Sequence, residues 1–123
     1  MGGSILGSEA LYCFLNKKTN KDFIFLNDID LNKLKMLKNK KDLSKVLFIV
    51  ISKSGNTIET LSNFLSLKII KKNSKNIVII SEKNNNPLHQ LAKEFNLYYV
   101  ENKDYIGGRY SVLSEVGMVP AYL

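Results

Sequence analysis

The stretch Val46-Leu-Phe-Ile-Val-Ile-Ser-Lys-Ser-Gly-Asn-Thr-Ile-Glu-Thr60 decides the fold of this 123-residue chain. Its first six residues are apolar and mostly β-branched, without polar alternation, which is typical of a strand covered on both faces in a parallel sheet. A short segment rich in hydroxyl groups follows at residues 52–57. From Ile58 onward apolar residues recur at helical spacing, so the pattern predicts a strand, a short loop and a helix in that order.

The loop has the composition of an anion-binding turn. Backbone N–H groups without partners and the positive end of the helix dipole point at whatever occupies such a turn. Glycine permits a positive φ, hydroxyl groups donate to phosphate oxygens, and lysine adds a positive charge. The candidate phosphate-binding residues are therefore Ser52, Lys53, Ser54, Gly55, Asn56 and Thr57. Simple N-capping of the helix by Asn56 or Thr57 is the alternative. The loop lacks the Walker A pattern, which favours a phosphorylated small molecule over a nucleoside triphosphate.

Helices and strands alternate along the rest of the chain. Helices are expected from Ser4 to about residue 16, around residues 31–37, after the loop, and around residues 87–95. Further strands are expected at residues 22–26, 76–81 and 97–100. This order predicts a single α/β domain over residues 1–123, a doubly wound parallel sheet sandwiched by helices, with ligands at the carboxyl ends of its strands. No strand precedes the Gly2-Gly3-Ser4 turn, so we expect a sheet that is incomplete at its N-terminal edge, in a fragment of a longer protein.

Composition narrows the class of protein. The net charge is +7, but the lysines are dispersed, which argues against a nucleic-acid-binding face. No apolar run approaches the length of about 20 residues that a membrane span needs, and no secretion signal is visible. Cys13 is the only cysteine, which agrees with a reducing cytoplasm. With one histidine and one cysteine, neither a metal site nor a cofactor is expected.

The tail contains the only arginine among the 18 basic residues, Arg109, directly after Gly107 and Gly108. The two glycines free the backbone for close approach to a ligand, and a guanidinium supplies a planar, permanent charge that lysine cannot replace. A hairpin-like turn with a surface arginine is the alternative.

Three segments, residues 2–7, 52–60 and 107–114, together resemble the glucose-6-phosphate isomerase family. The middle segment alone would indicate only the broader class of sugar-isomerase (SIS) domains. The resemblance implies a flavodoxin-like SIS fold, and it spans this chain as about the first sugar-phosphate-binding domain of a longer enzyme. It implies contacts to the sugar from Gly3 and Ser4, and a site for the 6-phosphate in the loop. It also implies that Arg109, with Gly108 beside it, stabilises the negative charge of a cis-enediolate.

The same resemblance implies what this chain lacks. The family's catalytic carboxylate, ring-opening histidine and lysine lie beyond the residues present here, and neither His89 nor Glu115 matches them. We therefore expect binding of glucose 6-phosphate and fructose 6-phosphate, a homodimeric full-length enzyme in the cytoplasm, and little turnover by these residues alone. A stand-alone phosphosugar-binding module without catalysis, and a related SIS isomerase for another sugar phosphate, are the alternatives.

Overall fold

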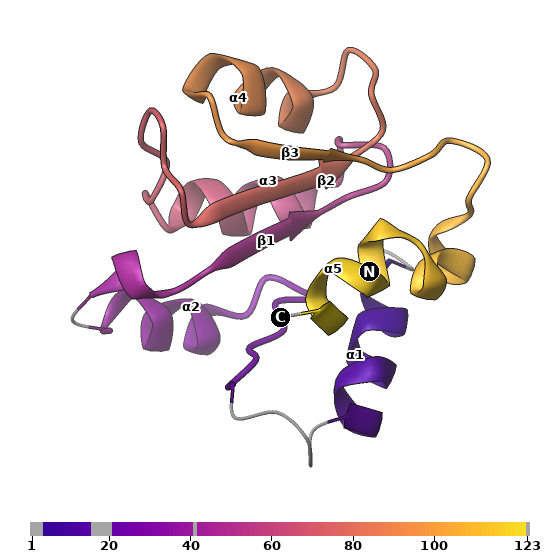
Figure 1. Cartoon of the computed structure of the whole chain (residues 1–123). Helices are drawn as coiled ribbons and strands as arrows, with labels where there is room; N and C mark the ends of the chain where they lie inside the picture. Colours follow the sequence, from indigo (N-terminus) through magenta and orange to yellow (C-terminus); the bar gives the residue numbers. More distant parts are fainter. Residues whose placement is uncertain (1–3, 16–20, 41, 123) are drawn as a thin grey trace.

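Three parallel strands form one sheet in the order β1–β2–β3 in the computed structural model, which describes residues 4–15, 21–40 and 42–122 (Figure 1). The strands are β1 (Phe48–Ile51), β2 (Ile77–Ser81) and β3 (Tyr98–Glu101). The helices are α1 (Ser4–Leu15), α2 (Leu31–Lys38), α3 (Ile58–Ser66), α4 (Pro87–Phe95) and α5 (Glu115–Tyr122), with the short 3₁₀ segments η2 (Leu43–Lys45) and η3 (Gly108–Leu113). The predicted α/β fold with a parallel sheet is confirmed.

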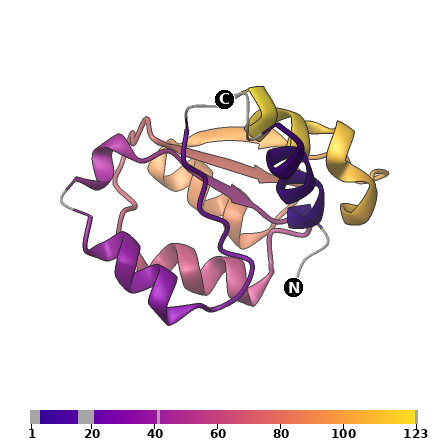
Figure 2. The same ribbon diagram turned by 90° about the horizontal axis from the view of Figure 1, so that it is seen from below.

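Helices α2, α3 and α4 cover one face of the sheet (Figure 2). Phe48 pairs with Ile77 and Val50 with Ile79 in the parallel register, so these four side chains project from the same face. All four are buried in one core cluster with apolar residues of the three helices, which include Leu34, Leu37, Phe64, Leu67, Leu88 and Ala92. Burial of this face is the main source of stability for the sheet.

The second face of β1 is only half-buried, because its residues alternate between buried and intermediate positions. The strand is therefore buried on one face and partly covered on the other, where the sequence predicted cover on both. The helices α1 and α5 and the segment η3 gather near the carboxyl ends of the strands (Figure 1). The Ser8 hydroxyl donates to the Val116 carbonyl at 3.0 Å, which ties α1 to α5. The two ends of the described chain thus meet beside the edge where ligands are expected.

The strand expected at residues 22–26 is absent from the structure. Phe23 and Phe25 contact the Tyr12 ring, with centroids 5.0 and 5.7 Å apart, whereas Ile24 and Leu26 pack against the core cluster. The side chains therefore alternate as they would in a strand. The segment has no strand partner among the described residues, because a cavity separates it from β1. The missing partner is the physical reason why the strand prediction is wrong.

Candidate phosphate-binding site

The loop between β1 and α3 turns at Gly55, which has a φ of +68°. A β-carbon at this position would lie 1.9 Å from Asn86 Oδ1, so glycine is required by sterics as well as by the backbone conformation. The Leu88 N–H also donates to the Gly55 carbonyl at 3.4 Å. The positive φ predicted for Gly55 is confirmed, and the group that approaches its backbone closely is the side chain of Asn86.

Several polar groups of the loop bond to one another. The hydroxyl oxygens of Ser52 and Thr57 lie 2.7 Å apart, and the Gly55 N–H donates to Ser52 Oγ at 3.1 Å. The Asn56 N–H donates to Ser54 Oγ at 3.3 Å. Thr57 is the N-cap residue of α3, yet its side chain makes no capping hydrogen bond. The simple capping alternative is therefore wrong, and the amino end of α3 lacks the side-chain acceptor that a capping residue would supply.

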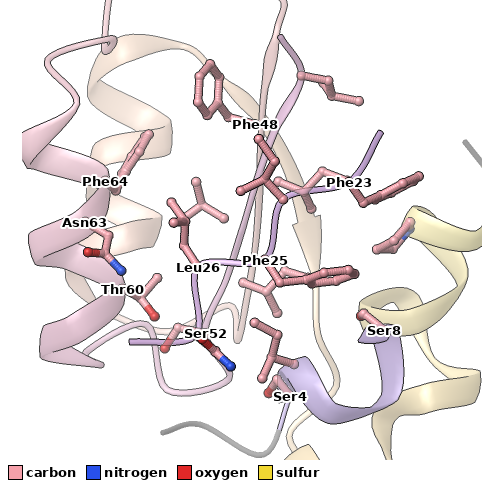
Figure 3. A pocket seen from close by; sticks show the side chains of 18 of the residues that line it. Ser4, Ser8, Phe23, Phe25, Leu26, Phe48, Ser52, Thr60, Asn63 and Phe64 are labelled. Carbon is pink, nitrogen blue, oxygen red and sulfur yellow. The ribbon is translucent and has the colours of Figure 1, made fainter. Parts of the chain in front are cut away.

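One cavity brings most of the predicted site residues together. It has a volume of about 890 Å³, and the predicted site residues along it are Ser4, Ser52, Lys53, Ser54, Thr57 and Gly108. Ser4 at the start of α1 and Ser52 at the end of β1 lie close to each other at one end of this cavity (Figure 3). Gly55 and Asn56 are outside the lining, since Gly55 packs on Asn86 and Asn56 is exposed. Gly3 is outside the described residues.

Lys53 is engaged by neighbours on two other loops. Its ammonium group donates to the Asp104 carbonyl at 2.8 Å and lies 3.7 Å from Glu82 Oε1. Glu82 follows β2 directly and lines the same cavity, although the sequence analysis did not single it out. Its place right after a buried strand was the available signal, because carboxyl ends of parallel strands share one edge. Lys53 therefore compensates the charge of a carboxylate beside the cavity.

Arg109 lies on η3, is exposed, and is outside the cavity lining, whereas its neighbour Gly108 is part of that lining. Gly107 has a φ of −64°, so this segment does not use the backbone freedom expected from its glycines. The turn is not hairpin-like, since residues 108–113 form a 3₁₀ segment with a hydrogen bond from the Ser111 hydroxyl to the Gly108 carbonyl at 2.6 Å, but the surface arginine of that alternative agrees with the exposure of Arg109.

The two other residues considered for catalysis lie away from the cavity. His89 is buried on α4, with Nδ1 2.7 Å from the Asn84 carbonyl and its ring stacked on Tyr99. Tyr99 donates to the Ser81 carbonyl at 2.7 Å, and burial raises the pKa of its hydroxyl. Glu115 is the first residue of α5 and does not line the cavity. His89 is thus a packed residue of α4 beside β3.

The described part of the chain was searched for metal-binding groups and for membrane-spanning helices. In residues 4–15, 21–40 and 42–122, no three His, Cys, Asp or Glu side chains are grouped in a way that could bind a metal ion. Within these same ranges, no helix is long and apolar enough to cross a membrane.

Comparison with known proteins identifies the family of the chain. The family model described as phosphoglucose isomerase matches residues 1–123. The chain belongs to the phosphoglucose isomerase family. A glucose-6-phosphate isomerase of Methanocaldococcus jannaschii is 36% identical over 124 residues, which are 99% of this chain and 31% of the relative. A glucose-6-phosphate isomerase of Borreliella afzelii is 37% identical over 131 residues, covering 97% of this chain and 24% of the relative.

The fold is also found in a solved structure. The crystal structure of a hypothetical protein from Thermus thermophilus matches with a TM-score of 0.86 and 30% identity, over 98% of this chain and 30% of that protein. This member of the phosphoglucose isomerase family thus spans between a quarter and a third of the length of the relatives it matches.

Proposed function

We propose that this chain forms the sugar-phosphate-binding SIS domain of a glucose-6-phosphate isomerase. The complete enzyme would interconvert glucose 6-phosphate and fructose 6-phosphate, a step shared by glycolysis and gluconeogenesis, as a homodimer in the cytoplasm. The observation that carries the proposal is the convergence of Ser4, four residues of the loop and Gly108 on one cavity at the carboxyl end of the sheet; the loop residues are Ser52, Lys53, Ser54 and Thr57. Family membership supports the class of substrate.

The phosphate would bind at the amino end of α3. The hydroxyl groups of Ser52 and Thr57 bond to each other at 2.7 Å, and each can instead turn its hydrogen toward a phosphate oxygen that lies beside both. The helix dipole adds a favourable field for a dianion at the amino end of α3. Thr57 makes no side-chain capping bond there, so the phosphate can take the place of a cap. Ser4 would contact the sugar from the opposite side of this end of the cavity.

Arg109 would act on the sugar rather than on its phosphate. Isomerisation moves a proton between C1 and C2 through a cis-enediolate, and its negative charge needs a nearby cation. The exposed guanidinium of Arg109 would have to turn toward the cavity past Gly108, where no β-carbon obstructs it. Neither His89 nor Glu115 lines the cavity, so proton transfer and ring opening need groups supplied by other parts of the enzyme.

Calorimetric titration of the chain with glucose 6-phosphate, and separately with glucose, tests the phosphate site. We expect heat of binding only with the phosphorylated sugar. Ser52→Ala should weaken binding at least about tenfold, the value of one hydrogen bond to a charged group, whereas Ser74→Ala, at a half-buried serine outside the cavity, should not change it. Equal binding of glucose and glucose 6-phosphate would contradict the phosphate site. Binding without turnover agrees with both the enzyme domain and the non-catalytic module. Joining the chain to the rest of an isomerase distinguishes these two functions, because only the enzyme domain should then give turnover.

A further inference from the structure

The loops that follow the three strands meet at the carboxyl edge of the sheet. Lys53 belongs to the β1–α3 loop, Glu82 follows β2, and Asp104 lies in the β3–η3 segment, residues 102–107 (Figure 1). The Glu82 N–H donates to the Lys53 carbonyl at 2.9 Å. The N–H of residue 102 donates to the last residue of β2 at 2.8 Å. The β1–α3 loop and the β3–η3 segment are thus each joined to the end of β2.

The side chain of Lys53 links the β1–α3 loop directly to the β3–η3 segment. Its Nζ donates to the Asp104 carbonyl at 2.8 Å and lies 3.7 Å from Glu82 Oε1. The longer distance exceeds the usual length of a hydrogen bond, so Glu82 acts on the ammonium group through its charge. The Lys53 side chain is 32% exposed and that of Glu82 is 19% exposed, so salt screens this pair less than a fully exposed one. The attraction therefore favours the position of the ammonium group at the Asp104 carbonyl.

The carboxylate of Glu82 is itself held in place. Its Oε2 accepts a hydrogen bond from Asn84 Nδ2 at 3.1 Å. Its backbone carbonyl accepts from the Asn84 N–H at 2.9 Å and from Asn86 Nδ2 at 2.8 Å. The negative charge opposite Lys53 is therefore positioned by the turn between β2 and α4.

The β3–η3 segment consists of short turns that lead directly to Arg109. The Ile106 N–H donates to the Lys103 carbonyl at 3.2 Å, and the Tyr110 N–H donates to the Gly107 carbonyl at 2.9 Å. Consecutive turns restrict the backbone between their ends. A contact that fixes the middle of this segment therefore also fixes the backbone of Arg109.

The contact with Lys53 is such a point. In the described part of the chain, no other hydrogen bond joins the β3–η3 segment to the β1–α3 loop. Asn102 is 1% exposed, yet neither polar atom of its side chain has a hydrogen-bond partner among the described residues. Its side chain therefore adds no hydrogen bond that would hold the segment to a neighbouring loop.

We propose that Lys53 is a positioning residue: Glu82 holds its ammonium group at the Asp104 carbonyl, and this contact keeps the backbone of Gly108 and Arg109 at the cavity. The inference rests on the proposed function, in which the β1–α3 loop binds the phosphate and Arg109 acts on the sugar. With the backbone fixed, only the side chain of Arg109 has to turn toward the substrate.

The same pairing limits the part that the Lys53 side chain takes in phosphate binding. A dianion beside the ammonium group would also lie near the carboxylate of Glu82, so attraction and repulsion would largely cancel. The hydroxyl groups of Ser52 and Thr57 then contribute more to phosphate affinity than Lys53 does.

NMR relaxation of the 123-residue chain tests the positioning role without a substrate. In Lys53→Met the backbone order parameters of residues 104–109 should fall from about 0.85 to below about 0.6, and in Glu82→Gln they should fall less. Lys53→Arg keeps a charged donor and should preserve the order. Lys103→Met is the matched control, because Lys103 pairs with Glu101 at 3.3 Å, and it should leave the order parameters unchanged. Unchanged values in Lys53→Met would overturn the proposal, and Glu82→Gln gives the same readout where Lys53→Met does not fold.

Titration with glucose 6-phosphate distinguishes positioning from phosphate binding. Lys53→Met should weaken binding by less than about threefold, as expected for a partly exposed charge that is already paired. A loss as large as that in Ser52→Ala would make Lys53 a phosphate ligand and would overturn the proposal. Absence of binding by the unsubstituted chain would contradict the phosphate site alone, because the relaxation measurement needs no ligand.

Kinetics of a longer isomerase that carries this chain give the decisive readout. Lys53→Met should lower kcat at least about tenfold with little change in KM, because a small displacement of a catalytic group is costly. Lys53→Arg should restore most of the lost kcat. A purely structural role would reduce the amount of folded enzyme and leave both constants of the folded fraction unaltered. That result, or a rise in KM with kcat unaltered, would overturn the proposal.

Discussion

Gly55 and Asn86 are in direct contact, with the α-carbon of the glycine turned toward the asparagine side chain. Asn86 accepts the His89 N–H through Oδ1 at 2.9 Å and donates to the Glu82 carbonyl at 2.8 Å, so its position is fixed by α4 and by the end of β2. A β-carbon on Gly55 would lie 1.9 Å from Asn86 Oδ1, and the φ of +68° disfavours any other residue. The loop between β1 and α3 is thus shaped by Asn86, the N-cap residue of α4.

Gly55→Ala is therefore expected to destabilise the protein by about 2 kcal/mol or more, the sum of a left-handed backbone penalty and overpacking against a fixed side chain. Denaturant unfolding measures the change. Gly107→Ala is the matched control, because Gly107 has a φ of −64° and its β-carbon would meet only the Tyr110 ring, at 3.2 Å. A loss of stability as small in Gly55→Ala as in Gly107→Ala would mean that the Asn86 contact does not shape the loop.

The sequence predicted the strand, loop and helix at residues 46–60 better than it predicted the other strands, and the reasons are physical. The run from residue 46 to residue 60 contains its own strand, turn and helix signals, so local pattern was enough to place the loop. Residues 23–26 are as continuously apolar as residues 46–51, but a strand also needs a partner, which one segment does not reveal. The ion pair of Lys53 with Glu82 joins residues far apart in sequence, and only the parallel sheet brings them together. Arg109 was singled out because it is the only arginine in the sequence. Its exposure could not be predicted in the same way, because it depends on the 3₁₀ segment after Gly107.

Lys53→Met is expected to destabilise the chain by about 1 kcal/mol, mainly through loss of the hydrogen bond to the Asp104 carbonyl. Glu82 should contribute a smaller coupling, about 0.2–1 kcal/mol, because the 3.7 Å ion pair is partly exposed. A double-mutant cycle with Glu82→Gln, followed by urea unfolding, separates the two contributions. Additive effects of the two substitutions would show that Lys53 and Glu82 do not interact, and the pairing described above would then be incorrect.

Tyr99 gives the fold a defined response to alkaline pH. Burial raises the pKa of its hydroxyl above the ordinary value of 10.0, so the folded state favours the neutral form. Its contribution to stability is complete below the unfolded pKa and is lost as the pH rises through the folded pKa. Tyr99→Phe should therefore cost about 1 kcal/mol at neutral pH, through loss of the bond to the Ser81 carbonyl. This difference from the unsubstituted chain should shrink above about pH 10.

Urea unfolding of both proteins at several pH values measures this difference. Tyr105→Phe is the control, because Tyr105 is 80% exposed, and it should leave the pH profile unchanged. A stability difference between Tyr99→Phe and the unsubstituted chain that stays constant across the alkaline range would contradict the assigned environment of Tyr99.

Arg109→Lys tests the proposed charge-stabilising role, and it requires a longer isomerase that carries this chain as its sugar-phosphate domain. Lysine keeps the charge but loses the planar, bidentate donor, so stabilisation of an enediolate should fall more than binding of the substrate. We expect kcat to fall by about tenfold to a hundredfold with little change in KM, equivalent to about 1.4–2.7 kcal/mol of transition-state stabilisation. Tyr110→Phe, at the neighbouring exposed position, should change neither constant. A rise in KM with kcat unaltered would instead place Arg109 among the groups that only bind the substrate.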